Sequence, residues 1–372
     1  MRRISVLALV LFTGLIAAQL PHALARSQHQ ITTFDVPGAG TGPGQGTIVN
    51  GITADGSVAG WYTDANNVNH GFLRSSDGTI TKFDAPGAGT GAGQGTRALG
   101  MNDAGTITGV CDVSSDAFYG YVRSRNGHIT TFEAPGAGAG AFQGTAAGNI
   151  NPAGEISGAY ADATLARHGY VRAANGNITE FDPPGDGTGA HQRVYTSFFY
   201  GLNPAGELVG LYSDSNDVFH GYVRSPNGSI ATFDAPGAGA GDGQGTFAQG
   251  INPSGATTGS FADANNVYHG FLRARDGVIT TFDVPGAGSS DGQGTSPSSI
   301  DPSGAITGYF ADGNNVNHGF VRDSHGTITA FDVPGAGTGY AQGTLAFGGN
   351  PSGTITGSYV DANNVNHGFV RN

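Results

Sequence analysis

The residues best suited to chemistry in this sequence form a repeated pair, an Asp followed six positions later by a His. A carboxylate beside an imidazole can bind a metal ion or transfer a proton. The same pair can also form a structural hydrogen bond between the tip of a hairpin and the strand that follows it. Because a pair that recurs along the chain suits architecture better than one active site, we favour the structural interpretation. The six copies are Asp64/His70, Asp162/His168, Asp214/His220, Asp263/His269, Asp312/His318 and Asp361/His367.

Four of these Asp residues begin an oxygen-rich segment, in which two Asn residues follow one small residue. Carboxylate and amide oxygens are the ligands that calcium prefers in proteins. The sequence implies no cofactor, and weak calcium binding is the alternative that these segments leave open. The candidate ligands are Asp64, Asp263, Asp312 and Asp361.

One connecting segment, residues 183–200, departs from the others and is three residues longer. It carries His191, Arg193 and Tyr195 where the other connections carry Gly and Ala. Arg offers a planar donor fork for a carboxylate, and Tyr and His offer flat rings for a sugar or an aromatic ligand. Insertions in repeat proteins often lie on the binding face. We therefore predict a ligand site at these three residues. The alternative is sequence drift, with the following residues up to Tyr200 serving only to pack the next strand.

Other motifs that carry chemistry are absent or weak. The Gly-rich connections resemble phosphate loops, but no helix pattern or Lys follows them. The sequence has no Gly-x-Ser-x-Gly elbow and no His-Glu-x-x-His motif. Cys111 lies in an apolar stretch, which favours packing over reactivity. Trp61 is the single Trp, and it fits either a stacking platform or packing.

The elements that must position these residues repeat at a fixed period. An aromatic-acid pair begins at Phe34 and returns every 49 residues, except for one step of 52 residues after Phe181. Each unit contains three turn signals, Asn-Pro-x-Gly, Asp-x-Asn-Asn and Asn-Gly or Asp-Gly, between short stretches with strand character. Four short strands per unit, repeated at this length, are typical of a β-propeller. A β-solenoid is the alternative, but three hairpin turns per unit argue against it.

The two ends of the repeat region each hold part of a unit. Residues 31–34 match a fourth strand, and residues 368–371 match a third strand. Pairing them would complete a seventh unit and remove the exposed sheet edges. We therefore predict an all-β fold, a seven-bladed β-propeller with four antiparallel strands per blade and a ring closed by pairing of the N- and C-terminal strands.

The first 25 residues have the pattern of a secretory signal peptide. Arg2 and Arg3 precede an apolar stretch over residues 4–18, and residues 23–25 read Ala-Leu-Ala. An N-terminal anchor helix is the alternative, although the apolar stretch is short for a membrane span. We expect residues 1–25 to be the signal peptide and residues 26–372 to form one propeller domain, and the protein to be secreted.

The charge of the chain excludes some partners. Loss of Arg2 and Arg3 with the signal peptide would change the formal net charge from −12 to −14. An acidic chain with so few Lys residues is poorly suited to nucleic acid or to anionic membrane surfaces. No stretch after the signal is long enough to insert into a membrane. A single Cys also rules out an intrachain disulfide.

The repeated Gly-Ile-Asn and His-Gly-Phe segments, such as Gly250–Asn252 and His70–Phe72, resemble the HAF-type extracellular repeat proteins of bacteria. The resemblance covers residues 31–372. It implies export and a repeat architecture, and it implies no established activity.

These observations predict a secreted, monomeric scaffold that binds glycan or protein. In a propeller blade the Pro-Gly connections and the Asp-x-Asn-Asn tips share one face, which should be acidic and rich in Asn and Gly. The Arg residues that end the third strands should make the opposite face more basic. We expect ligand binding on the acidic face. The alternative is a propeller enzyme, a lyase or hydrolase, with a cation-assisted site on the same face.

Overall fold

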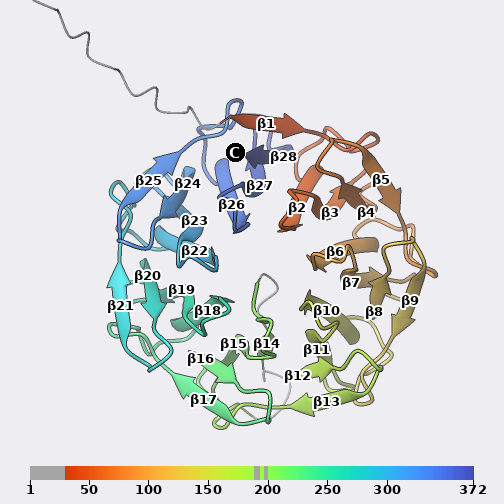
Figure 1. Ribbon diagram of the computed structural model, residues 1–372, viewed down its shortest axis with the longest axis horizontal. Helices are drawn as coiled ribbons and strands as arrows, with labels where there is room; N and C mark the ends of the chain where they lie inside the picture. Colours follow the sequence, from red (N-terminus) through yellow and green to blue (C-terminus); the bar gives the residue numbers. More distant parts are fainter. Residues whose placement is uncertain (1–29, 188–192, 197–199) are drawn as a thin grey trace, which may run out of the picture.

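The computed structural model describes residues 30–187, 193–196 and 200–372. Every regular element in these residues is a β-strand, and Figure 1 shows the strands arranged around a ring. The strands form seven groups of four, named here blades 1 to 7 in chain order. The sequence-based prediction of an all-β propeller with four-stranded units is confirmed.

The first strand of each blade lies nearest the ring axis, and the second strand pairs with it in antiparallel fashion. The first strands of blades 1 to 7 are β2 (Gly46–Ile52), β6 (Gly95–Met101), β10 (Gly144–Ile150), β14 (Val194–Thr196), β18 (Gly245–Ile251), β22 (Gly294–Ile300) and β26 (Gly343–Gly349). The second strands are β3 (Val58–Thr63), β7 (Ile107–Asp112), β11 (Ile156–Ala161), β15 (Leu208–Ser213), β19 (Thr257–Ala262), β23 (Ile306–Ala311) and β27 (Ile355–Val360).

The third and fourth strands complete each blade outward, and the fourth strands run along the rim of the ring in Figure 1. The third strands are β4 (Asn69–Arg74), β8 (Phe118–Arg123), β12 (Arg167–Arg172), β16 (Phe219–Arg224), β20 (Tyr268–Arg273), β24 (Asn317–Arg322) and β28 (Asn366–Arg371). The fourth strands are β5 (Ile80–Phe83), β9 (Ile129–Phe132), β13 (Ile178–Phe181), β17 (Ile230–Phe233), β21 (Ile279–Phe282), β25 (Ile328–Phe331) and β1 (Ile31–Phe34).

The two ends of the repeat region meet in blade 7. Strand β1 pairs antiparallel with β28, with Ile31 opposite Arg371 and Phe34 opposite Gly368. The backbone N–H of Asn372 also donates to the carbonyl of Gln30 at 3.0 Å. The predicted pairing of the two ends is therefore present, and the first-encoded strand supplies the outer edge of the last blade.

Neighbouring blades hold together through one repeated aromatic contact. The Phe that ends each fourth strand packs edge-on against the buried aromatic ring on the third strand of the next blade, with ring centroids 5.9–6.3 Å apart. Such pairs stabilise a core beyond the area that they bury. In the first of them, Phe34 of blade 7 contacts Phe72 of blade 1.

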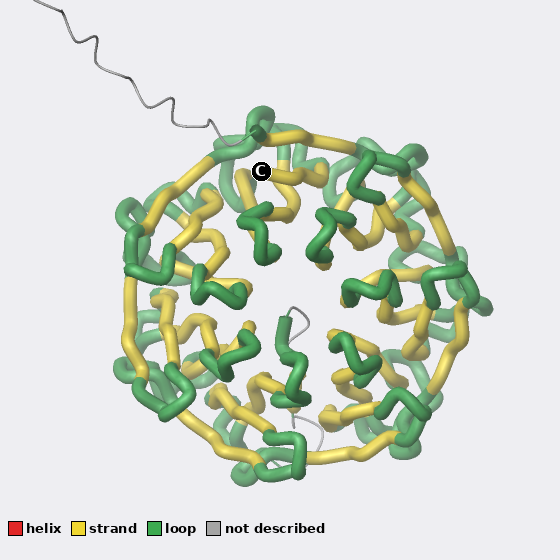
Figure 2. Tube along the Cα trace, in the orientation of Figure 1, coloured by secondary structure: helices red, strands yellow, loops and turns green. Residues whose placement is uncertain are grey.

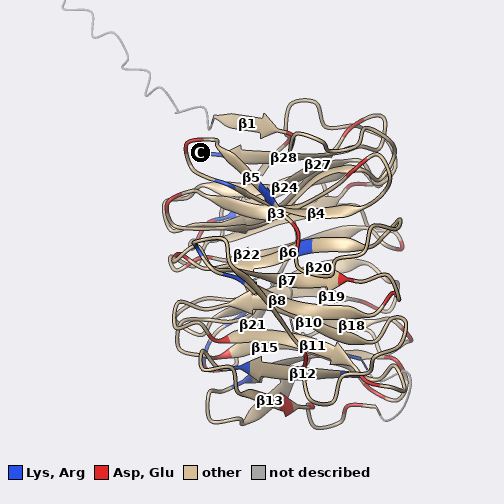
Figure 3. Ribbon diagram, turned by 90° about the vertical axis from the view of Figure 1, so that its right-hand side faces the viewer, with Lys and Arg blue, Asp and Glu red and all other residues tan. Residues whose placement is uncertain are grey.

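The Arg residues at the ends of the third strands pack against the preceding blade. Each guanidinium lies 4.6–5.0 Å from the centroid of the same fourth-strand Phe ring of the preceding blade, as Arg74 does over Phe34. These side chains therefore serve packing between blades. The turns on their side of the disc carry Asp55, Asp103 and Asp323, and Figure 3, an edge-on view, shows acidic residues in the loops of both faces. Acidic residues therefore lie on both faces, and the expected difference in charge between the faces stays a prediction.

Two further observations concern the whole described part of the chain. None of the described segments forms an apolar helix long enough to cross a bilayer. Cys111 is buried on β7, and burial, with help from nearby Asp112, raises the pKa of its thiol to about 11. A thiol of this kind is a poor nucleophile, as its apolar sequence context predicted.

Candidate functional site

The repeated Asp/His pair forms part of a three-residue cluster in six blades. In each cluster the His Nδ1–H donates at 2.8–3.0 Å to the carboxylate of the acid that follows the fourth-strand Phe, as His70 does to Asp84. Its Nε2 lies 3.6–3.8 Å from the Asp at the hairpin tip, Asp64 in this blade. The imidazole also stacks on a ring of the second strand, Tyr62, with centroids 4.9 Å apart. We call this arrangement the Asp–His–Asp cluster.

The tip carboxylates are occupied by their own turns. The Oδ1 atom of Asp64 accepts the backbone N–H groups of Asn66 and Val68, at 2.8 and 2.9 Å. Asp263, Asp312 and Asp361 accept the equivalent N–H groups. Burial raises the pKa of Asp64 and the turn N–H groups lower it, with a net result below the ordinary value. The described residues contain no group of three or more His, Cys, Asp or Glu side chains placed to hold a metal ion. The hydrogen bonds that each tip carboxylate accepts within its own turn fit the structural interpretation.

Blade 2 lacks the cluster, and this exception shows that the fold does not require it. Val113 and Tyr119 stand where the other blades carry the tip Asp and the His. The N–H of Asp116 still donates to the carbonyl of Val113 at 2.9 Å, so the turn keeps its shape. The cluster therefore adds to the stability of a turn that the backbone can form by itself.

The predicted site in the long connection is only partly brought together. His191 lies outside the described residues. Tyr195 lies on β14, and the guanidinium of Arg167 stacks 5.3 Å from its ring centroid. Arg193 forms a parallel bridge with Arg167. In the equivalent position the other blades carry a Gly, because a Cβ there would collide with the preceding blade, as it would at Gly95 against the carbonyl of Asn69.

The same connection places a side chain near the axis of the ring. Tyr200 belongs to blade 4, yet its hydroxyl donates to the carbonyl of Asn50 in blade 1 at 3.4 Å. It packs against the hydrophobic core of blade 1, and its position also crowds Gly348 of blade 7. Tyr200 thus reaches across the channel, where Figure 2 shows the loop of blade 4 extending toward the centre. The expectation that this residue only packs within the next strand was too narrow.

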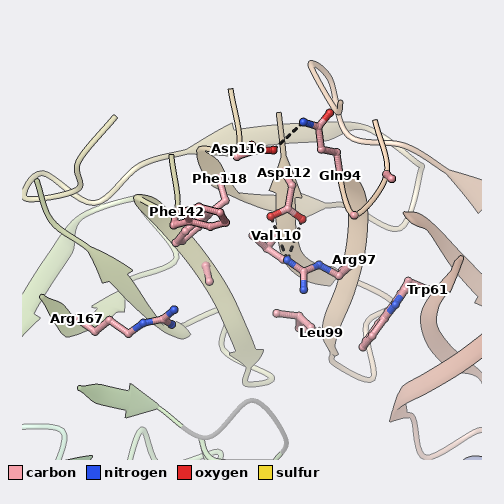
Figure 4. Close-up of a pocket in the computed structure, with 13 residues that line it drawn as sticks. Trp61, Gln94, Arg97, Leu99, Val110, Asp112, Asp116, Phe118, Phe142 and Arg167 are labelled. Carbon is pink, nitrogen blue, oxygen red and sulfur yellow. Dashed lines mark hydrogen bonds and ion pairs between the residues drawn. The ribbon is translucent and has the colours of Figure 1, made fainter. Parts of the chain in front are cut away.

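A cavity of about 620 Å³ opens beside the axis, between blades 1, 2 and 3. We call it the charged cavity. Figure 4 shows Arg97 and Arg167 entering it from opposite sides, with Trp61 beyond Arg97, and Phe118 and Phe142 also line it. The residues used below are Trp61, Arg97, Asp112, Phe118, Phe142 and Arg167. A concave site with aromatic walls and a few polar groups is the usual form of a small-molecule site.

The pairing register of the strands explains why these side chains point into the cavity. Arg97 is the third residue of β6, and it lies opposite Val110 of β7 in the antiparallel ladder. Asp112, two residues after Val110, points to the same face because side chains alternate along a strand. Phe118 and Arg167 begin the third strands of blades 2 and 3. The residues at the same positions differ among the blades. The backbone is therefore repeated from blade to blade, while the side chains that line the cavity vary.

The charges in the cavity are arranged unequally. Nη2 of Arg97 donates to both oxygens of Asp112, at 3.1 and 2.8 Å. Burial raises the pKa of Asp112 above its ordinary value, although Arg97 acts in the opposite direction. Arg167 forms no ion pair with any described residue, and its guanidinium stacks on the ring of Tyr195. One guanidinium is thus neutralised and the other is available to an anion.

Phe142 marks the rim of the cavity by its unusual conformation. Its side chain is 69% exposed, and its φ is 62°. A bulky residue in the left-handed region is a genuine outlier, and such strain gathers at functional sites. Blades 1 and 5 place Gly44 and Gly243 at this position, where a positive φ costs nothing. Phe142 keeps an exposed aromatic ring at a backbone position where Gly would avoid the strain. This indicates that the ring belongs to a contact surface.

Sequence reasoning missed most of this site. Trp61 was considered as a stacking platform, but Arg97, Asp112, Phe142 and Arg167 were not singled out. The usable signal was the place where the repeats disagree: the position of Arg97 reads Ile, Arg, Ala, Tyr, Phe, Ser and Leu in blades 1 to 7, with Tyr195, the second residue of β14, as the member from blade 4. Different residues at one repeated position single out this position as a candidate part of a site.

Comparisons with known proteins support the fold. The chain is similar to a virginiamycin B lyase from Staphylococcus aureus, with 15% identity and a TM-score of 0.57 over 93% of this chain and 100% of that one. A streptogramin B lyase matches at 17% identity and a TM-score of 0.52 over 92% of this chain and 98% of that one. A puromycin hydrolase matches at 14% identity and a TM-score of 0.55, over 86% of this chain and 50% of that one. Neither a protein-family model nor a curated protein matches the sequence. At these identities the likeness shows an all-β propeller and leaves function to the site.

Proposed function

We propose that the protein is an exported, monomeric seven-bladed propeller, closed by β1 and β28, that binds an acidic glycan in the charged cavity. The observation that carries this proposal is Arg167, a guanidinium without an ion-pair partner among the described residues, beside aromatic side chains. The signal sequence and the resemblance to HAF-type extracellular repeats support export. The glycan ligand is the more specific form of the expected glycan or protein partner.

The charged side chains of the cavity indicate that the ligand carries an acid group. The chain is strongly acidic, with a formal net charge of −12, so a negatively charged ligand is repelled by most of its surface. The charged cavity holds two Arg and two Asp side chains. Arg97 pairs with Asp112, and Asp116 accepts a hydrogen bond from the Gln94 amide, so Arg167 is the Arg without an ion-pair partner among the described residues. Arg binds a carboxylate through two parallel N–H groups, which fixes both position and orientation. A ligand carboxylate at Arg167 therefore gains an interaction that no other described part of this site supplies.

The aromatic residues that line the cavity indicate that the ligand contains a sugar ring. Trp61, Phe118 and Phe142 provide flat apolar surfaces of different orientation, and Phe142 stands at the opening. Rigid aromatic rings give large contact area at low entropic cost, and Trp is the strongest anchor of this kind. The volume of about 620 Å³ lies within the range of small-molecule pockets. A pyranose with one carboxylate, such as a uronic acid or a sialic acid, matches both parts.

The single Trp allows a direct test. Because Trp61 is the only Trp and lines the cavity, its fluorescence reports this site alone. Glucuronate, galacturonate and N-acetylneuraminate would be titrated, with glucose as the uncharged control. At least one acid should change Trp61 emission, and glucose should not.

The matched variant is Arg167→Asn, because Asn69, Asn317 and Asn366 occupy this position in three other blades. It should weaken the binding by about tenfold or more while the melting temperature is unchanged. Equal binding by parent and variant would contradict the proposal, as would the absence of any response to the three acids.

A second candidate function is an enzyme of the same site, a lyase or hydrolase, and the raised pKa of Asp112 is the observation that favours it. Perturbed carboxyl groups in clefts are candidates for acid or base catalysis. Asp112 is 16% exposed in the cavity and lies beside a group that can stabilise an anion. The test is incubation of parent and Asp112→Asn protein with oligogalacturonate. Shortening by the parent alone would establish catalysis, and no shortening by either would leave binding as the function.

A further inference from the structure

A second cavity, of about 360 Å³, lies between blades 5, 6 and 7. We call it the neutral cavity. Its position in blade 6 corresponds to that of the charged cavity in blade 2, because both use the third residue of the first strand and the fourth residue of the second strand. Arg97 and Val110 in blade 2 are replaced by Ser296 and Tyr309 in blade 6. The two cavities therefore share a backbone and differ in side chains.

The neutral cavity is lined by aromatic rings and uncharged polar groups. Its rings include Phe247, Tyr268, Tyr309 and Phe347. Tyr309 and Phe347 meet edge-on with centroids 6.3 Å apart, and Phe247 lies 5.9 Å from Tyr268. The polar lining consists of Ser, Gln and Asn side chains, and none of the described lining residues is charged. These rings are half-buried, so each keeps a surface that faces the cavity.

The fold does not require aromatic residues at these positions. The equivalent of Phe247 is Ala146 in blade 3, and the equivalent of Tyr309 is Ser260 in blade 5. Blade 6 carries Ser298 where blade 7 carries Phe347. Small residues thus satisfy the same backbone elsewhere in the ring. Three large rings on consecutive blades, all turned to one cavity, indicate a surface kept for contact with a ligand.

From this arrangement we infer that the neutral cavity is a second binding site, which takes an uncharged sugar ring. Aromatic faces pack against the apolar face of a pyranose, and hydroxyl and amide groups bind its hydroxyls as both donors and acceptors. The absence of charge among the described lining residues disfavours an anion, since no guanidinium or ammonium repays the desolvation of a carboxylate. This inference does not depend on an acidic ligand in the charged cavity.

The test uses uncharged methyl glycosides of glucose, galactose, mannose and N-acetylglucosamine, observed by saturation-transfer difference NMR on the whole mature protein. At least one glycoside should show saturation transfer at about 1–10 mM, the range of weak single-sugar binding. Trp61 emission should stay constant during the same titration, because Trp61 does not line the neutral cavity. No transfer from any of the four glycosides at these concentrations would overturn the inference.

Two variants locate the site. Tyr309→Ser, which copies Ser260 of blade 5, removes one ring, and Ser296→Arg, which copies Arg97 of blade 2, fills the cavity without removing a ring. Each should weaken glycoside binding by about tenfold or more, with an unchanged melting temperature for at least one of them. Arg167→Asn is the control and should bind the glycoside like the parent. Undiminished binding by a folded Ser296→Arg protein would overturn the inference, as would equal loss in the Arg167→Asn control.

Discussion

The Asp–His–Asp clusters and the cavity walls near the axis follow opposite rules. The cluster repeats with almost the same distances in six blades, 2.8–3.0 Å on one side of the His and 3.6–3.8 Å on the other. The axial wall changes from Arg97 in blade 2 to Phe247 in blade 5 and Ser296 in blade 6. Both regions rest on the same four-stranded frame.

The difference separates two tasks. A repeated contact stabilises every blade in the same way and needs no special position in the ring. A ligand site needs several unlike groups to converge, and residues of adjacent blades converge in this way at the charged cavity. A search of the sequence for recurring residues therefore finds the clusters and misses the ligand site. Blade 2 illustrates both regions, because it lacks the cluster and supplies Arg97 and Asp112 to the charged cavity.

The strongest way to break the shared frame is to open the ring. Deletion of Gly368–Asn372 removes most of β28, which pairs with β27 and β1, together with the fully buried Phe369. We expect a loss of about 5 kcal/mol or more in the free energy of unfolding, since a core aromatic and two ladders disappear. Thermal unfolding measures the effect, and deletion of Asn372 alone is the control. A melting temperature within about a degree of the parent would contradict closure by this pair.

Acid should destabilise the repeated region through its tip carboxyls. The tip carboxyls Asp64, Asp162, Asp214, Asp263, Asp312 and Asp361 all have a pKa below the ordinary value of 3.8, with burial opposing the shift and the turn N–H groups causing it. A lowered folded-state pKa contributes stability above the unfolded pKa and loses it as pH falls through the folded one. We therefore expect the free energy of unfolding to fall below about pH 4.

The variant that sharpens this prediction is Asp263→Asn. The amide oxygen can still accept the N–H groups of Asn265 and Val267, which Asp263 now accepts at 2.8 and 2.9 Å, but it does not titrate over this range. Urea unfolding at pH 6 and pH 3 should show a smaller difference for the variant than for the parent. An identical pH dependence would show that the tip carboxyls do not carry the effect.

Removal of one cluster imidazole should have a smaller effect. In blade 5, His269 lies 2.9 Å from Asp283 and stacks on Phe261 at 5.0 Å, but its side chain is partly exposed. Exposed ion pairs contribute little, so we expect His269→Ala to cost about 1 kcal/mol. Urea unfolding measures the cost, and binding at both cavities should be unchanged. A loss of sugar binding in this variant would place function in the repeated region instead.

The smallest expected effect is that of calcium. The Oδ1 atoms of the tip carboxyls already accept turn N–H groups, and their Oδ2 atoms face a His. A cation would have to displace these contacts. We expect calorimetry with millimolar calcium to give no binding heat and a chelator to leave the melting temperature unchanged. Heat that is lost in an Asp361→Ala variant would restore the calcium hypothesis for Asp64, Asp263, Asp312 and Asp361.

The four-stranded blades could be predicted from the sequence because their turns and strands depend on local residue patterns. The turn at Asp64, the strand ending at Arg74 and the Phe34 that meets the last blade all recur at a constant spacing. The charged cavity could not be predicted in this way. Arg97 and Arg167 are 70 positions apart, and each looks like drift within its own unit. Only the pairing of strands, followed by the packing of adjacent blades, brings them to one space.

The most direct test of the central claim is the stoichiometry of acidic-sugar binding, measured by calorimetry with the sugar that changes Trp61 emission. A site made by unlike residues near the axis predicts one sugar per chain and loss of the heat in Arg167→Asn protein. A site made by the repeated region predicts up to six equal sugars per chain, one for each Asp–His–Asp cluster, and no effect of Arg167→Asn. One site that is abolished by the variant supports the account. Several equal sites that survive it would contradict the account.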